Sequence, residues 1–160
     1  THSLNDLIEQ QLSLQYEWVK PNKIYRCKPI MILQNDYQLS LFNGDIGLIW
    51  ESDDKQKFAY FETANGLVKY PIYNLPSFEV NYAMTIHKTQ GSEFESVDII
   101  LPNIENEFLN RQLLYTGITR AKLNVSLYTD SKTLTQVIMR TADRISGIDI
   151  NLSKAIKSVN

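Results

Sequence analysis

The sequence contains few of the residues that build disulfide-stapled, metal-dependent or membrane-spanning proteins. One cysteine, Cys27, and two histidines occur among its 160 residues. A single cysteine excludes an internal disulfide framework, and so few sulfur and imidazole ligands argue against a structural zinc site. No apolar run approaches the ~20 residues of a membrane span, and the N-terminus lacks the basic-then-apolar pattern of a signal peptide. We therefore expect no metal site, no membrane contact and a reducing, cytoplasmic location.

The phosphate-binding loop Gly-x-x-x-x-Gly-Lys-Ser/Thr is also missing. The nearest approach to it, Gly44-Asp45-Ile46-Gly47, has neither the lysine nor the length. Transfer of a phosphoryl group needs a backbone cradle with its lysine, together with a metal held by a hydroxyl and a carboxylate. We therefore expect the chain to have no ATPase activity by itself.

The overall composition is that of an ordinary soluble domain. Hydrophobic residues make up 43% and charged residues 21%, and the net charge is −2. The length corresponds to one domain, or to one domain with a small insertion. Domains that bind nucleic acid are usually basic, so this charge argues against a chain that binds nucleic acid alone. It says less about a chain that forms one wall of a nucleic-acid channel, because such contacts are local.

The first 79 residues combine a helix pattern with a series of strand patterns. Apolar spacing over residues 4–14 predicts an amphipathic helix capped by Ser3 or Asn5. The apolar run at 30–34 predicts a strand of an α/β domain. Residues 41–79 then alternate turn signals with short strands, which is typical of a small SH3-like barrel. The strands are expected at 46–50, 58–63, 67–70 and near 73–75, and the strongest hairpin signal is Asn65-Gly66.

Two later stretches place polar residues at the ends of regular elements. From Tyr82 the pattern favours a short helix stopped by Gly91, followed by a buried strand at 97–101. Residues 108–120 form an amphipathic pattern that ends in a basic residue, with Leu113, Leu114 and Ile118 on its apolar face. A strand at 123–128 and a helix at 132–142, capped by Asp130 or Ser131, complete the pattern. Helices that alternate with buried strands favour an α/β fold with a site at the edge of its sheet.

These two stretches resemble motifs V and VI of superfamily 1 helicases. The matching residues are His-Lys-Thr-Gln-Gly-Ser-Glu-Phe at 87–94 and Tyr-Thr-Gly-Ile-Thr-Arg-Ala at 115–121, in that order. The resemblance is to the RecD type, the alpha subunit of exodeoxyribonuclease V, and it extends over most of residues 4–148. It implies a RecA-like parallel-sheet domain, the second motor domain (2A), formed by residues 1–40 and 80–148. Residues 41–79 would be the inserted SH3-like subdomain (2B), and 149–160 a flexible tail.

The resemblance also implies roles for residues in a nucleotide site. Arg120 would be the arginine finger that reaches the γ-phosphate. Glu93 would accept a hydrogen bond from the ribose, Gly91 would let the backbone turn, and Gln90 would contact phosphate or the domain interface. Composition alone leaves other roles open: Arg120 would also suit a helix C-terminus, and Glu93 could cap nearby amides.

Three more residues resemble those with which motif V contacts single-stranded DNA. Thr85, His87 and Lys88 offer hydroxyl, imidazole and ammonium donors, which can hold phosphates without reading sequence. A partly buried histidine satisfied by the backbone is the alternative for His87, and a solvated surface position is the alternative for Lys88. A hydrolase pairing of His87 with Glu93 is disfavoured, because no nucleophile elbow accompanies it.

The implied function is that of a C-terminal motor domain in a 5′→3′ DNA helicase of recombinational repair. ATP and Mg²⁺ would be bound mainly by an N-terminal motor domain outside this chain. Partners would be single-stranded DNA and, in an exodeoxyribonuclease V, the RecB and RecC subunits. The alternative is a non-enzymatic recruitment module built on the barrel, which would need neither Arg120 nor Glu93.

Overall fold

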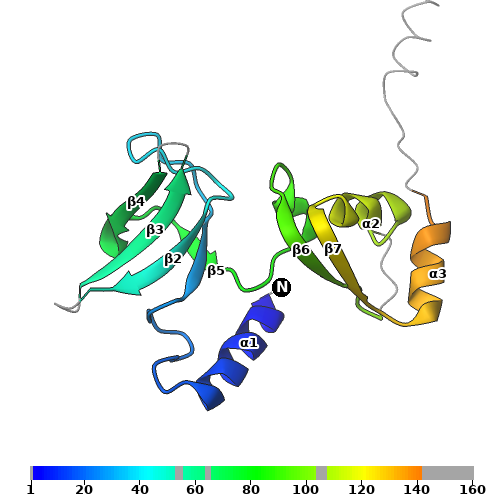
Figure 1. The fold of residues 1–160 in the computed structure, drawn as a ribbon, viewed down its shortest axis with the longest axis horizontal. Helices are drawn as coiled ribbons and strands as arrows, with labels where there is room; N and C mark the ends of the chain where they lie inside the picture. The colour runs from blue at the N-terminus through cyan, green and yellow to red at the C-terminus, as the bar shows by residue number, and fades with distance from the viewer. Residues whose placement is uncertain (1, 53–55, 64–65, 104–107, 142–160) are drawn as a thin grey trace, which may run out of the picture. The chain divides into compact units, whose positions relative to one another are not determined.

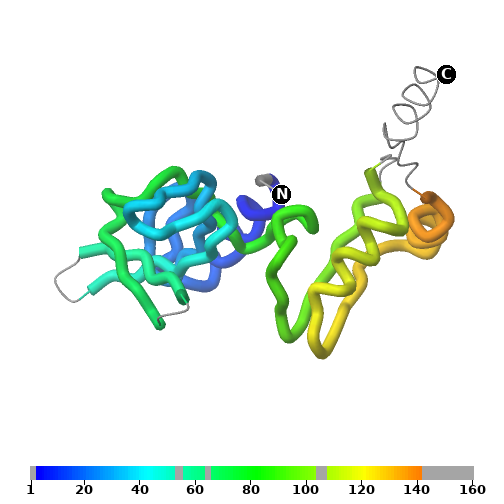
Figure 2. The backbone as a smooth tube through the Cα atoms, turned by 90° about the horizontal axis from the view of Figure 1, so that it is seen from above, coloured from blue at the N-terminus to red at the C-terminus, as the bar shows by residue number. Residues whose placement is uncertain are grey.

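The computed structural model describes residues 2–52, 56–63, 66–103 and 108–141. The chain forms two compact units, Thr1–Thr89 and Gln90–Asn160, called the first and second units below. Figures 1 and 2 show the ribbon and the backbone path within each unit. Within the described ranges, no helix is long and apolar enough to cross a membrane.

The first unit is a helix followed by a five-stranded antiparallel sheet (Figure 1). The sheet order is β4-β3-β2-β1-β5, and every pair of neighbours is antiparallel. Its elements are α1 (His2–Gln15), β1 (Pro29–Ile32), β2 (Ile46–Glu51), β3 (Lys57–Thr63), β4 (Gly66–Pro71), the 3₁₀ helix η1 (Ile72–Asn74), β5 (Phe78–Val80) and the 3₁₀ helix η2 (Ile86–Thr89).

Alternation along the strands builds the core of this unit. In β2 the residues Gly47 and Ile49 face inward, while Leu48 on the other face is exposed. A Cβ at Gly47 would lie 2.5 Å from the ring of Phe61, so the glycine makes room for that ring. Six side chains that are almost completely buried form the core: Ile30, Ile32, Leu41, Ile49, Ala59 and Phe61.

Two strand predictions for the first unit are wrong. The apolar run at 30–34 forms a strand, but β1 pairs antiparallel with β2 and β5 instead of joining a parallel sheet. A short run that is buried on both faces looks the same in either sheet type, so the sequence does not indicate its neighbours. The strand expected near 73–75 is a 3₁₀ helix with Tyr73 exposed, and the last strand is β5.

The N-terminal helix is confirmed, but its predicted cap is not. Helix α1 already includes Ser3 and Asn5, and the amide of Asn5 binds the backbone near Ala83 instead of its own helix. Asn65, half of the predicted hairpin signal, and the predicted tail 149–160 lie outside the described residues.

The second unit is built on a parallel β-α-β arrangement. Strands β6 (Phe94–Ile100) and β7 (Ala121–Tyr128) pair in parallel, and α2 (Arg111–Ile118) connects them. The predicted helix α3 (Ser131–Met139) begins at the predicted cap, because Asp130 accepts a hydrogen bond from the Thr133 amide at 2.8 Å. A parallel pair joined by a helix fits the α/β domain expected from the sequence.

Candidate nucleotide and DNA contact sites

A glycine turn leads into strand β6. Gly91 has a φ of +88°, in the left-handed region that favours glycine. Among the described residues, no atom lies within 4 Å of the position that a Cβ would occupy there. The backbone conformation, and not crowding, therefore requires glycine, and the predicted glycine turn is confirmed. Glu93 follows on the exposed part of this loop.

Arg120 lies directly after α2 and contacts the same loop. Its Nη1 donates to the carbonyl oxygen of Ser92 at 3.3 Å, and its Nε donates to that of Thr116 at 3.2 Å. Its Nη2 donates to the hydroxyl of Thr119 at 3.4 Å. The carbonyl oxygen of Arg120 accepts from the Phe94 amide at 2.8 Å, which joins the start of β7 to the start of β6. Arg120, in the stretch that resembles motif VI, therefore contacts the loop that resembles motif V.

The surroundings of Arg120 leave its charge available. All three acceptors of its guanidinium are neutral oxygens, and no carboxylate in the described part of the chain pairs with it. A half-buried guanidinium held by long bonds to neutral groups can exchange them for stronger bonds to an anion. Part of the helix-terminus alternative is also realised, because Thr116 offers one of the last carbonyls of α2.

Glu93 has a partner that the motif comparison did not suggest. The Nζ of Lys122 lies 3.5 Å from a carboxylate oxygen of Glu93, and both side chains are more than half exposed. The pairing of Phe94 with Ala121 brings the start of β6 beside the start of β7, so this contact depends on strand pairing and no local pattern in the sequence indicates it. An exposed pair of this kind stabilises the fold little, so both groups remain free to contact a ligand.

The helix that precedes Arg120 differs in one respect from the prediction. Leu114 and Gly117 are the buried residues of α2, and Asn110 caps its start by accepting from the Leu113 amide. Ile118, expected on the buried face, has 41% of its surface exposed. The buried position in the last turn of α2 is Gly117, three residues after Leu114, and not Ile118.

The proposed DNA-contact residues share one exposed turn of the first unit. The short helix expected from Tyr82 is only the 3₁₀ turn η2, and Thr85 precedes it. His87 is exposed, so the alternative of a partly buried histidine is wrong. Lys88 is partly exposed and forms an ion pair with Glu79 of β5. Three donors of different types thus lie close together at the surface.

The structure groups the predicted site residues into two sets. Gly91, Glu93 and Arg120 lie together in the second unit, where exposed Gln90 begins the chain of that unit. Thr85, His87 and Lys88 belong to the first unit. Over the described residues, no group of three or more histidine, cysteine, aspartate or glutamate side chains is arranged to hold a metal ion.

Comparisons with known proteins show similarity to helicases. The sequence profile of the UvrD-like helicase C-terminal domain matches residues 81–128, a range that contains η2, the Gly91 turn and Arg120. The RecBCD enzyme subunit RecD of Haemophilus influenzae is 38% identical over 136 residues, or 85% of this chain and 19% of the relative. The ATP-dependent RecD2 DNA helicase of Deinococcus radiodurans is 32% identical over 89 residues, or 56% of this chain and 12% of the relative.

A solved structure shares the fold. The Pif1 helicase from Bacteroides, in complex with ADP-AlF3 and single-stranded DNA, superposes with a TM-score of 0.50 at 20% identity. The match covers 85% of this chain and 34% of that protein. The chain spans about a fifth of the length of the RecD relative. By sequence, motifs and fold, this chain is a homologue of the RecD-type superfamily 1 helicases, related to the C-terminal part that carries motifs V and VI.

Proposed function

We propose that this chain is the C-terminal motor domain of an ATP-dependent 5′→3′ DNA helicase that acts in recombinational repair, at the processing of double-strand break ends. The observation that carries the proposal is the meeting of Arg120 with the Gly91–Glu93 loop in the β6-α2-β7 arrangement. A guanidinium, a glycine turn and an exposed carboxylate on one edge are suited to a nucleotide presented by another domain.

Each residue has one task in this proposal. Bound ATP supplies the phosphoryl group that is transferred to water. Arg120 exchanges its bonds to the carbonyls of Ser92 and Thr116 for bonds to γ-phosphate oxygens, and offsets the negative charge that spreads over them. Glu93 accepts a hydrogen bond from a ribose hydroxyl, while Gly91 lets the backbone approach the nucleotide and Gln90 contacts phosphate or the domain interface.

The donor set fits part of a nucleotide site and not a magnesium site. Arg120 offers a half-buried planar donor and Glu93 an exposed acceptor. The described residues hold no cluster of carboxylates for a divalent ion. We therefore assign Mg²⁺ and the phosphate cradle to an N-terminal motor domain of the longer protein, and the arginine and ribose contacts to this chain.

The domain layout is part of the same proposal. The sequence predicts 41–79 as the inserted SH3-like subdomain 2B, and 1–40 with 80–148 as the RecA-like domain 2A. The antiparallel order β4-β3-β2-β1-β5 supports a small β subdomain with its own core. Because β1 pairs within that sheet, we include Pro29–Ile32 in the β subdomain.

The partners follow from the same relatives. Single-stranded DNA would contact Thr85, His87 and Lys88 on the exposed turn. RecB and RecC subunits would be partners if the longer protein acts in a RecBCD enzyme, as the Haemophilus relative does by name. The recruitment-module alternative is not favoured, because the matches are to helicases and the chain carries both Arg120 and Glu93.

The first experiment tests whether the chain is only part of a motor. We expect the purified 160-residue chain to hydrolyse no ATP above background, with or without single-stranded DNA, because it has no phosphate cradle. An Arg120→Ala variant is the control for contaminating helicases, whose turnover would survive that change. Turnover that is present in the chain and lost in Arg120→Ala would overturn the two-domain proposal.

The second experiment tests the DNA contacts in the longer protein. Replacing His87 and Lys88 by alanine should weaken binding to oligothymidylate and flatten its salt dependence. With fewer phosphate contacts, binding releases fewer counterions from the DNA. The matched control is Glu79→Gln, which frees Lys88 from its ion pair and should not weaken binding. Unchanged affinity and salt slope in the alanine variant would contradict the assignment.

A further inference from the structure

The segment that carries Thr85, His87 and Lys88 is attached to helix α1 by one buried amide. Asn5 is 6% exposed. Its Nδ2 donates to the carbonyl oxygens of Val80 at 3.1 Å and Ala83 at 3.0 Å, and its Oδ1 accepts from the Ala83 amide at 2.7 Å. The side chain thus binds both polar backbone groups of Ala83, in the way that a neighbouring strand would. It fixes the backbone just before the exposed turn.

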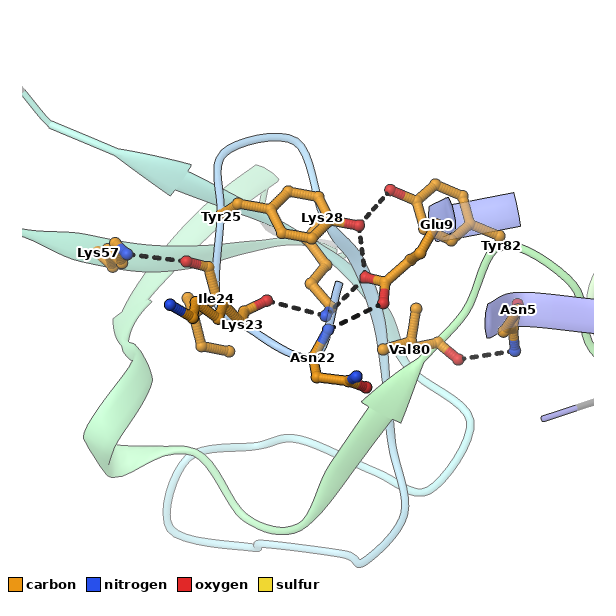
Figure 3. A network of polar contacts seen from close by, with 10 residues as sticks. All are labelled: Asn5, Glu9, Asn22, Lys23, Ile24, Tyr25, Lys28, Lys57, Val80 and Tyr82. Atoms are coloured by element: carbon orange, nitrogen blue, oxygen red, sulfur yellow. Dashed lines mark hydrogen bonds and ion pairs between the residues drawn. The ribbon is translucent and has the colours of Figure 1, made fainter. Parts of the chain in front are cut away.

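A second connection reaches the same segment through Tyr82. Figure 3 shows the chain of contacts: the hydroxyls of Tyr82 and Tyr25 lie 2.8 Å apart, and Tyr25 donates to a carboxylate oxygen of Glu9. The Nζ of Lys28 lies 2.7 Å from that carboxylate and also donates to the Lys23 carbonyl at 2.9 Å. Glu9 and Lys28 are almost completely buried.

Both connections start from one face of α1. Asn5 and Glu9 lie one helical turn apart, so their side chains leave the helix on the same side. Burial raises the pKa of the Tyr25 hydroxyl, and its bond to Glu9 raises it further. The phenol therefore stays protonated and donates.

A buried ion pair adds little to the net free energy of unfolding. The cost of removing both charges from water often equals or exceeds their attraction, and apolar side chains of similar volume can do as well. Directional bonds instead specify one geometry. The geometry specified here is that of Tyr82 and Ala83, directly before the turn with the proposed DNA contacts.

We propose that Asn5 and Glu9 are positioning residues for single-stranded DNA binding: through Ala83 and the Tyr25–Tyr82 pair, they hold the Thr85–Lys88 turn in its binding conformation. The inference rests on the proposed function, which assigns DNA contact to that turn. It adds residues that lie outside motifs V and VI.

Hydrogen exchange in the 160-residue chain tests the positioning directly. In Asn5→Ala the Ala83 amide should exchange at least about tenfold faster, while the amides of β2 and β3 keep their protection. Asn5→Asp keeps the acceptor for that amide but turns a carboxylate oxygen toward the carbonyl oxygens of Val80 and Ala83, so it should lose protection at Ala83 as well. Unchanged exchange at Ala83, or an equal increase throughout β2 and β3, would show that Asn5 serves only general stability.

Binding to labelled oligothymidylate in the longer protein tests the consequence. Tyr82→Phe removes only the hydroxyl that joins the network, and Tyr70→Phe is its matched control, because the Tyr70 hydroxyl donates to the Leu39 carbonyl in the same unit. At a temperature where both variants are folded, Tyr82→Phe should weaken binding at least about threefold and Tyr70→Phe should not. Equal affinities would overturn the proposal.

The double variant of His87 and Lys88 separates the two possible failures. If it leaves affinity unchanged, the DNA assignment of the turn fails, and the exchange at Ala83 alone decides whether Asn5 positions the segment. If it weakens binding while Asn5→Ala and Tyr82→Phe do not, the assignment stands and the positioning role fails.

Discussion

The two units bury their sheets to very different extents. The first unit has six core side chains with at most 1% of their surface exposed, among them Phe61 and Ile49. In the second unit Ile99 of β6 is 4% exposed, while Leu123 and Val125 of β7 have 73% and 40% of their surfaces exposed. A sheet of five antiparallel strands can close a core of its own, whereas parallel strands in proteins are normally covered on both faces. The candidate nucleotide residues therefore lie on the unit whose sheet is less buried among the described residues.

The largest expected effect is in the core of the first unit. Phe61→Ala should lower the free energy of unfolding by about 3–5 kcal/mol, because it removes a buried ring and leaves a cavity. Both tryptophans, Trp18 and Trp50, belong to this unit, so tryptophan fluorescence during urea unfolding reports on it. A change below about 1 kcal/mol would show that this core is not tightly packed.

Removing the buried carboxylate should have the next largest effect. Glu9→Gln should cost about 3 kcal/mol at neutral pH, because Lys28 would remain buried without its counter-ion. The same fluorescence measurement applies, and Glu51→Gln is the control because its pair with Lys57 is more exposed.

The pH dependence of the first unit gives an independent check. Burial raises the pKa of Glu9, but hydrogen bonds from Lys28 and Tyr25 and the charge of Lys28 outweigh it, so the net pKa is lowered. A carboxylate with a lowered pKa contributes stability above its unfolded pKa, and that stability is lost as pH falls through the folded value. Urea midpoints should therefore fall below about pH 4.5 in the wild type, and less steeply in Glu9→Gln. Parallel curves for the two proteins would contradict the assignment.

A smaller effect is expected in the second unit. Leu114→Ala should cost about 2 kcal/mol, the lower end of the range for buried leucine, because the surrounding core is thin and can relax. Amide exchange of α2 and β6 in the 160-residue chain measures it. A loss as large as that of Phe61→Ala would mean that the second unit is packed as well as the first.

The smallest effect belongs to the exposed ion pair. Lys122→Ala should change the free energy of unfolding by less than about 0.5 kcal/mol, because its pair with Glu93 is solvated. Amide exchange in β7 is the measurement. A cost above about 1 kcal/mol would show that this pair holds the loop and is not free for a ligand.

The sequence predicted the helices and strands of this fold better than it predicted which of them lie side by side. The strands at 46–50 and 58–63, the Gly91 turn and the Asp130 cap are local signals, and the structure contains all of them. The partners of β1 were wrong, because an apolar run does not specify the strand beside it. The bonds of Asn5 to Val80 and Ala83 span more than seventy positions, and no local pattern encodes them.

In the candidate site, too, the residues could be predicted from the sequence more readily than their contacts. The identity of Arg120 could be predicted from motif VI, and its contact with Ser92 follows from the pairing of β6 with β7, which the sequence only suggested. The ion pair of Lys88 with Glu79 was missed, because β5 itself was placed too early in the chain.

Arg120 gives the most direct test of the central claim, that this chain supplies the arginine of a nucleotide site formed with another domain. In the longer protein, Arg120→Lys should cut ATP turnover at least about a hundredfold, because lysine lacks the planar fork that binds phosphate oxygens. The melting temperature should stay nearly unchanged, since the bonds lost to Ser92, Thr116 and Thr119 are long and go to neutral oxygens. Lys132→Ala, which removes an exposed cation of the same unit outside the proposed site, is the control for charge. A variant that keeps most of its turnover, or that loses it only by unfolding, would contradict the claim.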